Sequence, residues 1–286
     1  MEDRGESSGN HGGGRSAPRL GGTTVFGVRT PKAPAEPRTL WSGAVTVSTR
    51  PWPHTRDWAY LLITGAHSRQ TSLPAHGIIE GWCRELAAAG YEGVRTGAVG
   101  PDIAESLCGN GFRPVQSLSL LTADLTCGPL PVRPDRSIRP VRNCAVNRQT
   151  TVDRILLIDA ASFGEKWCMD SGMLADAARA THRSRLFTAR DATGSPVGFV
   201  LVGMTDSTGF VQRLAVLPGH RRGGVALQLM GAAHRWLRMR GCTTSVVNTE
   251  TTNEAALSLY RRCGYAELSY GLQVLERPLT SGAARP

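Results

Sequence analysis

Residues 210–226 constrain the fold of this chain more than any other stretch. The apolar, β-forming run over residues 210–217 predicts a buried strand, which Pro218 and Gly219 end. Two arginines and two glycines follow, and apolar periodicity predicts a helix from Val225 onwards. This succession predicts an anion site, because the first helical turn has unpaired N–H groups and glycine lets a phosphate approach the backbone.

The spacing within this loop excludes the two commonest phosphate-binding patterns. The sequence has neither G-x-x-x-x-G-K-[ST] nor G-x-G-x-x-G at this place. It has Arg221-x-x-Gly224-x-Ala226, which resembles the [QR]-x-x-G-x-[GA] loop for the acetyl-CoA pyrophosphate in the GNAT superfamily of N-acetyltransferases. The alternative is an arginine-rich turn without a ligand. The cofactor-binding residues that the resemblance implies in this loop are Arg221, Arg222, Gly223, Gly224, Val225 and Ala226.

A second motif lies in a predicted helix over residues 253–263. The run from Asn253 to Tyr265 resembles the family pattern N-x-x-A-x-x-[LF]-Y-x-x-x-G-[FY]. A helix places Asn253, Ala256 and Tyr260 along one stripe. The resemblance implies that Asn253 binds near the pantetheine arm and that Tyr260 lies beside the CoA sulfur as the catalytic general acid. The alternative for Tyr260 is a packing role on a half-buried helix face.

The order of predicted elements from residue 137 onwards is that of the same family. Strands are expected over residues 138–141, 184–189, 197–204, 210–217 and 242–248, and helices over residues 151–161, 169–180, 225–240 and 253–263, with two strands after Gly264. The resemblance covers about residues 137–278. It implies an α/β fold of the GNAT type, with a mixed, mostly antiparallel central sheet and flanking helices, preceded by a smaller related α/β half.

The first half of the chain repeats part of this order. Strands are expected over residues 41–48, 58–65 and 91–98, a long strand or a hairpin over residues 112–125, and helices over residues 77–89 and 101–108. His67 corresponds to His220, and Gly111 corresponds to Gly264 at the same offset. The sequence therefore predicts a tandem GNAT arrangement of two related halves. Two α/β units that look alike by chance are the alternative.

The first half lacks the residues that the resemblance links to acetyl-CoA. The positions that correspond to Arg221, Gly223, Gly224 and Tyr260 hold Ser68, Gln70, Thr71 and Leu107, and Pro74 stands where the helix would begin. Side chains at these places would keep a phosphate away from the backbone. We therefore expect one acetyl-CoA site per chain. The first half would then pack against the second or shape its acceptor pocket.

Composition divides the chain into five segments. Residues 1–38 are rich in glycine, serine, proline and charge and are expected to be a disordered tail. Residues 39–127 are expected to form the degenerate GNAT-like half, and the prolines of residues 128–136 indicate a linker. Residues 137–280 are expected to form the catalytic domain, followed by a tail over residues 281–286.

The implied chemistry also needs an oxyanion site, a base and an acceptor pocket. In the family, two parallel strands separate, and the exposed backbone pairs with the pantetheine; this role falls on Leu214, Ala215 and Val216, which would also hold the oxyanion. Relatives that acetylate protein N-termini carry a glutamate at the position of Asn248, so the sequence does not identify a general base. The candidate substrate-side residues are Glu165, Trp167, Gln212, Asn248 and Glu250.

Charge and cysteine content restrict the ligands and the setting. The net charge is +10, almost all from arginine, which favours anionic ligands, although a GC-rich genome gives the same composition. The seven cysteines form no C-x-x-C pair, so neither a metal site nor a disulfide framework is expected, and the expected location is cytoplasmic. The sequence shows no run of about 18 apolar residues and no signal-peptide core, so no membrane association is expected.

These features predict an N-acetyltransferase that transfers the acetyl group of acetyl-CoA to a primary amine. A small-molecule amine is the first expectation, because a second half over the site would enclose it, whereas a peptide needs an open groove. A protein N-terminus or a lysine side chain is the alternative acceptor. The rival from another class is a non-catalytic module that senses CoA or binds nucleic acid, against which the intact loop and Tyr260 argue. The sequence leaves the oligomeric state open.

Overall fold

A computed structural model of the protein describes residues 38–42, 45–64, 75–126, 128, 137–140, 149–165 and 167–279. Apart from Arg38 and Gly128, the two expected tails and the expected linker lie outside these described residues. So do Ser68, Gln70, Thr71 and Pro74, the first-half positions at which the glycine loop is expected to have lost its chemistry. Leu107, the counterpart of Tyr260, is described and fully buried.

The N-terminal half alternates strands with two helices. Its elements are β1 (Arg38–Ser42), β2 (Thr46–Trp52), β3 (Thr55–Thr64), α1 (His76–Ala88), β4 (Gly93–Thr96), α2 (Pro101–Cys108) and β5 (Arg113–Asp124). The single strand expected over residues 41–48 is wrong. The chain reverses there, and Ser42 pairs with Thr46 so that β1 and β2 run antiparallel.

The C-terminal half follows the expected order, with ends that shift by a few residues. Its elements are β6 (Ile138–Pro140), α4 (Gln149–Phe163), α5 (Ser171–Arg179), β7 (Arg183–Arg190), β8 (Pro196–Thr205), β9 (Thr208–Val216), the 3₁₀ turn η1 (Pro218–His220), α6 (Val225–Met239), β10 (Thr244–Glu250), α7 (Glu254–Arg262), β11 (Ala266–Glu267) and β12 (Leu272–Pro278). Asn253 caps α7 as expected, because its side-chain oxygen accepts the Ala256 N–H at 3.1 Å.

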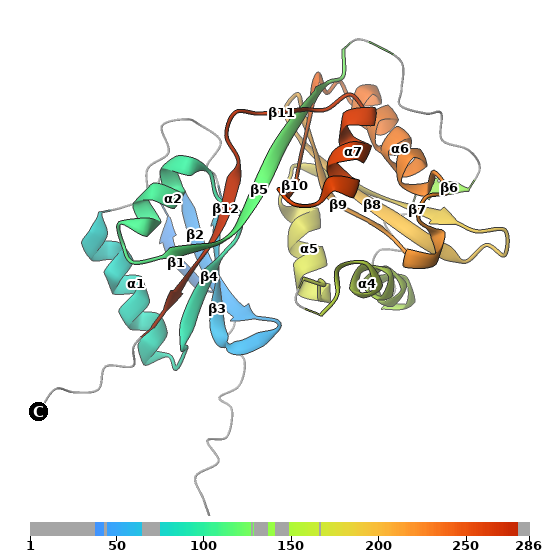
Figure 1. Ribbon diagram of the computed structural model, residues 1–286. Helices are drawn as coiled ribbons and strands as arrows, with labels where there is room; N and C mark the ends of the chain where they lie inside the picture. Colours follow the sequence, from blue (N-terminus) through green and yellow to red (C-terminus); the bar gives the residue numbers. More distant parts are fainter. Residues whose placement is uncertain are drawn as a thin grey trace, which may run out of the picture. The chain divides into compact units, whose positions relative to one another are not determined.

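The strands form one sheet in the order β1-β2-β3-β4-β12-β5-β10-β9-β8-β7-β6, with β11 paired to β5 (Figure 1). Only β3 with β4 and β9 with β10 are parallel among the described pairs. In each half, an antiparallel strand pair leads into a helix and then a parallel strand: β2, β3, α1 and β4 in the first, β8, β9, α6 and β10 in the second. The expected mixed, mostly antiparallel sheet with flanking helices, preceded by a related half, is confirmed.

The last strands of the two halves are exchanged. β5 belongs to the N-terminal half but pairs with β10, while β12, the last strand of the chain, pairs with β4 and lies on the other side of β5. Figure 1 shows β5 in green with β12 in dark red beside it. Each half therefore completes its part of the sheet with a strand from the other half.

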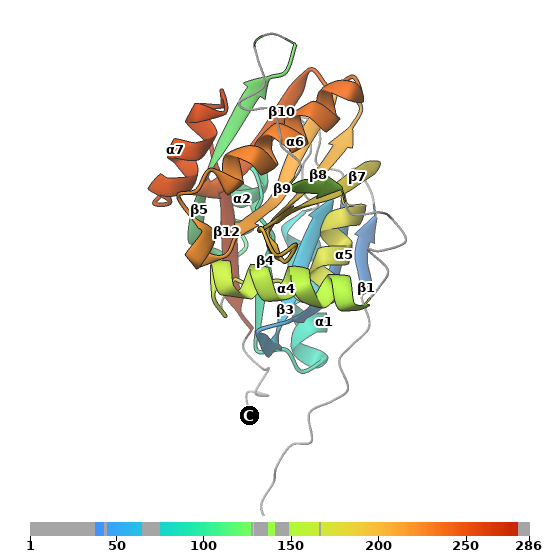
Figure 2. The same ribbon diagram turned by 90° about the vertical axis from the view of Figure 1, so that its right-hand side faces the viewer.

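Two hydrophobic layers cover opposite faces of the C-terminal strands. Strand β8, which is buried except at its two ends, shows the alternation: Val200 and Val202 pack with α6 and α7, whereas Phe199 and Leu201 pack with α4 and α5. Helix α6 runs across β7, β8 and β9 (Figure 2). A third cluster lies around α1 and α2 and includes Leu275 from β12, so the exchanged strand is part of the N-terminal core.

A buried polar network lies under α6. His234 Nε2 is 2.9 Å from the Tyr265 hydroxyl, which is 2.6 Å from Ser245 Oγ. Burial lowers the pKa of His234 to about 4, so this ring is neutral at physiological pH. Tyr265, the aromatic residue that ends the second motif, therefore has its hydroxyl fully engaged inside the core.

In the part of the chain that the structure describes, no helix is long and apolar enough to cross a membrane. The same residues include no group of three or more His, Cys, Asp or Glu side chains placed to hold a metal ion.

Candidate functional site

The parallel strands β9 and β10 separate halfway along their length. They pair from Thr208 with Thr244 to Val211 with Val247, and no pairing between them is described beyond that point. Residues 213–216 of β9 pair only with β8, on the other side, among the described strands. The three backbone positions expected to meet the pantetheine, Leu214, Ala215 and Val216, therefore lie on the part of β9 that β10 has left.

A β-bulge marks the point of separation. Leu201 pairs with Arg213 and Val202 with Val211, so Gln212 is the extra residue on β9. The bulge makes two consecutive side chains face the same way: Gln212 Nε2 donates to the Ala177 carbonyl of α5 at 2.6 Å, and Arg213 contacts α4. The bulge therefore directs two polar side chains to the α4–α5 side of the sheet.

The glycine loop joins η1 to α6 in the conformation that an anion site needs. Gly224 caps α6 with φ 78°, and Arg222 also has a positive φ of 66°. The first described helical bond runs from the Gln228 N–H to the Gly224 carbonyl, so the N–H groups of the first turn have no acceptor within the helix. A Cβ on Gly224 would meet nothing within 4 Å, which leaves this helix start accessible.

The Arg221 side chain binds two backbone carbonyls beside the loop. Its Nε donates to the Val216 carbonyl at 3.1 Å, and its Nη2 donates to the Ser162 carbonyl at 3.3 Å. Ser162 Oγ also donates to the Val216 carbonyl, at 3.1 Å. In this arrangement the guanidinium ties the loop to the end of β9 and to α4, and the following Arg222 is exposed.

Tyr260 lies in α7 within the core cluster shared by α6 and α7, and only 6% of its surface is exposed. Its ring centroid is 5.7 Å from that of Tyr265. Burial raises the pKa of the Tyr260 hydroxyl well above its usual range, and the Arg213 guanidinium opposes part of that rise. The hydroxyl is therefore protonated at neutral pH and able to donate a proton.

A buried ion pair anchors the segment between α4 and α5. Arg213 binds both oxygens of Asp159, with Nε–Oδ1 at 2.7 Å and Nη2–Oδ2 at 2.8 Å, and Asp159 is fully buried. Nη2 also donates to the Trp167 carbonyl at 2.7 Å, and the guanidinium carbon lies 3.4 Å from the centre of the Phe163 ring. Asp159 Oδ2 accepts the Met169 N–H at 2.7 Å. One charge pair thus holds both ends of this segment.

Asp159 and Arg213 are not among the residues that the sequence motifs pointed to. An acidic residue on the inward face of the helix over residues 151–161, and an arginine within the apolar run over residues 210–217, were the available signals. A charge at a buried position requires a partner, and the two signals together would have predicted a pair.

The N-terminal half contacts this same segment. Arg95 of β4 lies over the Trp167 ring with its guanidinium carbon 4.6 Å from the ring centre, and it also pairs with Glu276 of β12. His54 Nε2 lies 2.8 Å from the Cys168 carbonyl, and Arg50 Nη1 is 3.0 Å from Asp176 Oδ2 on α5.

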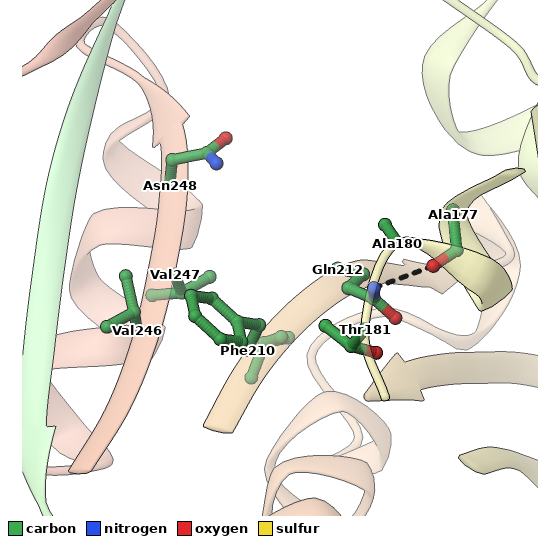
Figure 3. Close-up of a pocket in the computed structure, with 9 residues that line it drawn as sticks. Ala177, Ala180, Thr181, Phe210, Gln212, Val246, Val247 and Asn248 are labelled. Carbon is green, nitrogen blue, oxygen red and sulfur yellow. Dashed lines mark hydrogen bonds between the residues drawn. The ribbon is translucent and has the colours of Figure 1, made fainter. Parts of the chain in front are cut away.

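A pocket of about 330 Å³ opens where β9 and β10 separate (Figure 3). Figure 3 shows Asn248 on β10 at one side and Gln212, Ala177 and Thr181 at the other. Gln212 and Asn248 of the five expected substrate-side residues line it. Its lining residues are Ala177, Ala180, Thr181, Phe210, Val211, Gln212, Val246, Val247 and Asn248.

The other three expected substrate-side residues are not among those that line this pocket. Glu165 is exposed on the α4–α5 segment, and Trp167 is half-buried beneath Arg95. The Glu250 carboxylate accepts a hydrogen bond from Gln116 Nε2 on β5. The structure therefore brings together only part of the expected acceptor side.

Comparisons with known proteins agree with this geometry. Residues 153–265 match the model of the acetyltransferase (GNAT) family. An aminoglycoside N(6')-acetyltransferase type 1 from Klebsiella aerogenes is 36% identical over 70 residues, which cover 24% of this chain and 45% of that protein. The matched segments span less than half the length of the first relatives found.

Two solved structures share the fold across most of the chain. A tandem GNAT protein from the clavulanic acid biosynthesis pathway superposes with a TM-score of 0.57 and 14% identity, covering 82% of this chain and 79% of that one. A GCN5-related N-acetyltransferase from Kribbella flavida gives 0.56 and 16% identity, covering 84% and 89%. The separated strands and the glycine loop lie within residues 153–265, the part of the chain that is similar to the GNAT family of acetyltransferases.

Proposed function

We propose that the chain is an N-acetyltransferase that moves the acetyl group of acetyl-CoA to a primary amine. The observation that carries the proposal is the separation of β9 from β10 beyond Val211 and Val247. The strand edge that it exposes leads into the loop that ends at the open helix start of Gly224, and Arg213 on that strand influences the pKa of Tyr260. A non-catalytic module would not need a pocket at the point where the two strands separate.

The residues present fit acetyl-CoA. The first-turn N–H groups of α6, with Gly223, Gly224, Val225 and Ala226, suit the pyrophosphate because they combine unpaired donors with the positive end of a helix. The exposed backbone of residues 214–216 suits the pantetheine amides. When bound, acetyl-CoA supplies a thioester and a thiolate leaving group.

The chain's own groups then have separate tasks. The backbone N–H groups near residues 214–216 would stabilise an oxyanion, and Tyr260 would hold the proton for the departing sulfur. Gln212 and Asn248 would orient the acceptor amine from the two sides of the pocket. None of the described residues lining the pocket carries a carboxylate or an imidazole, so we assign the removal of the amine proton to water. The apolar walls favour the neutral amine.

We propose a small-molecule acceptor ahead of a protein N-terminus or a lysine side chain. The pocket is near the lower end of the roughly 300–1,000 Å³ range of small-molecule sites. The contacts from Arg50, His54 and Arg95 place the N-terminal half against the α4–α5 segment beside it. The N-terminal half would then support the acceptor wall, whereas the C-terminal half would bind acetyl-CoA.

The full-length chain is expected to bind one molecule of acetyl-CoA. The N-terminal half has the fully buried Leu107 where the C-terminal half has Tyr260. Of the residues that the structure describes, only the C-terminal half therefore has a tyrosine at the position of the proposed general acid. Isothermal titration calorimetry of the whole chain should give a stoichiometry near one, and the unfolding midpoint should rise with the logarithm of ligand concentration. The whole chain is needed because β5 completes the C-terminal strands. A stoichiometry of two would show that the first half also binds.

Gly224→Ala is expected to weaken acetyl-CoA binding about tenfold, a loss of about 1.4 kcal/mol. A methyl group there points into open space at the helix start, where we place the pyrophosphate. The matched control is Gly241→Ala at the other end of α6, because Gly241 has a φ of 82° and equally open surroundings. Both variants pay about 1 kcal/mol for the left-handed backbone. If calorimetry gives the two variants equal affinities for acetyl-CoA, the phosphates do not bind at this loop.

A further inference from the structure

The lining of the pocket between β9 and β10 indicates what kind of amine it accepts. We infer that the acceptor is a monoamine on a compact, uncharged and largely apolar body, and that polycationic amines are poor acceptors. This inference rests on the proposed function and narrows its substrate class.

The walls are apolar or neutral throughout the described lining. Phe210 and Val211 come from β9, Val246 and Val247 from β10, and the α5 side adds Ala177 and Ala180. The remaining three lining residues, Thr181, Gln212 and Asn248, are polar but uncharged. Burial of an apolar acceptor body against apolar walls stabilises the complex by about 25 cal/mol per Å² of apolar surface, and the same walls oppose the entry of a charge.

Two amide side chains remain available to position a neutral polar group or the amine. Gln212 uses its Nε2 for the Ala177 carbonyl, while its Oε1 is buried and accepts no hydrogen bond from any residue that the structure describes. A buried acceptor without a donor is costly, and an amine N–H supplies one. Asn248 is exposed across the pocket from it (Figure 3).

The carboxylates on the surrounding elements lie outside the described lining of the pocket. Asp159 of α4 binds Arg213, Asp176 of α5 binds Arg50 and Arg179, and Glu250 of β10 accepts from Gln116. A second ammonium on the acceptor would lose water without gaining a counter-charge, which is strongly unfavourable.

Cations on the same elements do not favour an anionic body either. The Arg213 and Arg50 guanidiniums are held by their carboxylates, and His182 and Arg183, which follow Thr181, line a different hollow. An acceptor that carries a carboxylate therefore meets no free counter-charge in the described lining. Charge neutrality of the acceptor body is the property that the pocket selects.

The test measures CoA release from acetyl-CoA by the full-length chain with matched acceptors. Pentylamine and 1,5-diaminopentane differ by one ammonium, and 2-phenylethylamine and phenylalanine differ by one carboxylate; kanamycin represents aminoglycosides. We expect kcat/KM to be at least tenfold higher for each monoamine than for its charged partner, and higher than for kanamycin. A preference for the diamine or kanamycin would overturn the inference and leave the acetyltransferase proposal intact.

A pair of variants locates this selectivity in the pocket. Val246→Asp adds a carboxylate to the lining, and Val246→Asn adds the same shape without charge. We expect the ratio of pentylamine to diaminopentane kcat/KM to fall at least tenfold in the Asp variant and to stay within a factor of three in the Asn variant. Equal ratios in both variants would overturn the assignment of this pocket to the acceptor.

A failure of the proposed function looks different from a failure of this inference. CoA release with none of these amines, together with no rise in unfolding midpoint on adding acetyl-CoA, would contradict the acetyltransferase itself, and the inference with it. If CoA is released and kcat/KM is highest for the charged amines, only the inference about the acceptor class is contradicted.

Discussion

Replacing Tyr260 with phenylalanine is expected to lower turnover about a hundredfold while leaving the affinity for acetyl-CoA unchanged. The ring packs in the core against Tyr265 and stays in the variant, so the fold is preserved. Only the hydroxyl is lost, and burial raises its pKa, so that it is protonated at neutral pH. General acid catalysis contributes about 10²–10⁴-fold, and a thiolate needs that help least because a free thiol has a pKa of about 8.5. Steady-state kinetics and calorimetry give the two quantities.

Tyr265→Phe is the matched control. Its hydroxyl is bonded to His234 and Ser245 inside the core and has no task in the proposed chemistry, so its loss should lower stability by about 1–3 kcal/mol and leave the turnover of the folded protein unchanged. If Tyr260→Phe weakens acetyl-CoA binding but keeps turnover, Tyr260 is a packing residue. If neither quantity moves, water supplies the proton.

Breaking the Asp159–Arg213 pair is expected to cost about 3–5 kcal/mol of folding free energy. In Arg213→Met the fully buried Asp159 carboxylate loses both of its charged bonds, and the Trp167 carbonyl loses its donor. In Asp159→Leu the guanidinium loses its counter-charge and the Met169 N–H its acceptor. Urea unfolding measures both losses, which are large relative to the roughly 5–15 kcal/mol stability of a typical domain.

The double variant Asp159→Leu with Arg213→Met separates pairing from packing. Because it leaves no buried charge, it should be more stable than either single variant, and the double-mutant cycle should show a coupling larger than 0.5 kcal/mol. Additive losses would mean that each side chain contributes through its packing alone. The four hydrogen bonds around this pair would then be incidental to the stability of the α4–α5 segment.

The sequence determined the features that depend on short stretches of chain. The glycine loop, the Asn253 cap and the helix α2 over Pro101–Cys108 follow from turn residues, capping side chains and apolar periodicity within a few residues of each other. The same signals gave the order of elements and the family resemblance over the residues that match the family model. The single strand expected over residues 41–48 is divided into β1 and β2, and this difference also concerns only a short stretch of chain.

The tertiary structure alone decided which strands lie next to each other and which charges are paired. No periodicity in β5 or β12 indicates that they exchange places between the halves, because backbone pairing is set by partners more than a hundred residues away. The bulge at Gln212 appears only in the register of β8 with β9, and it turns Gln212 and Arg213 to the same face. The neutral pocket and the Asp159–Arg213 pair exist only once that face closes against α4 and α5, since burial and charge pairing are properties of surroundings that a linear sequence does not specify.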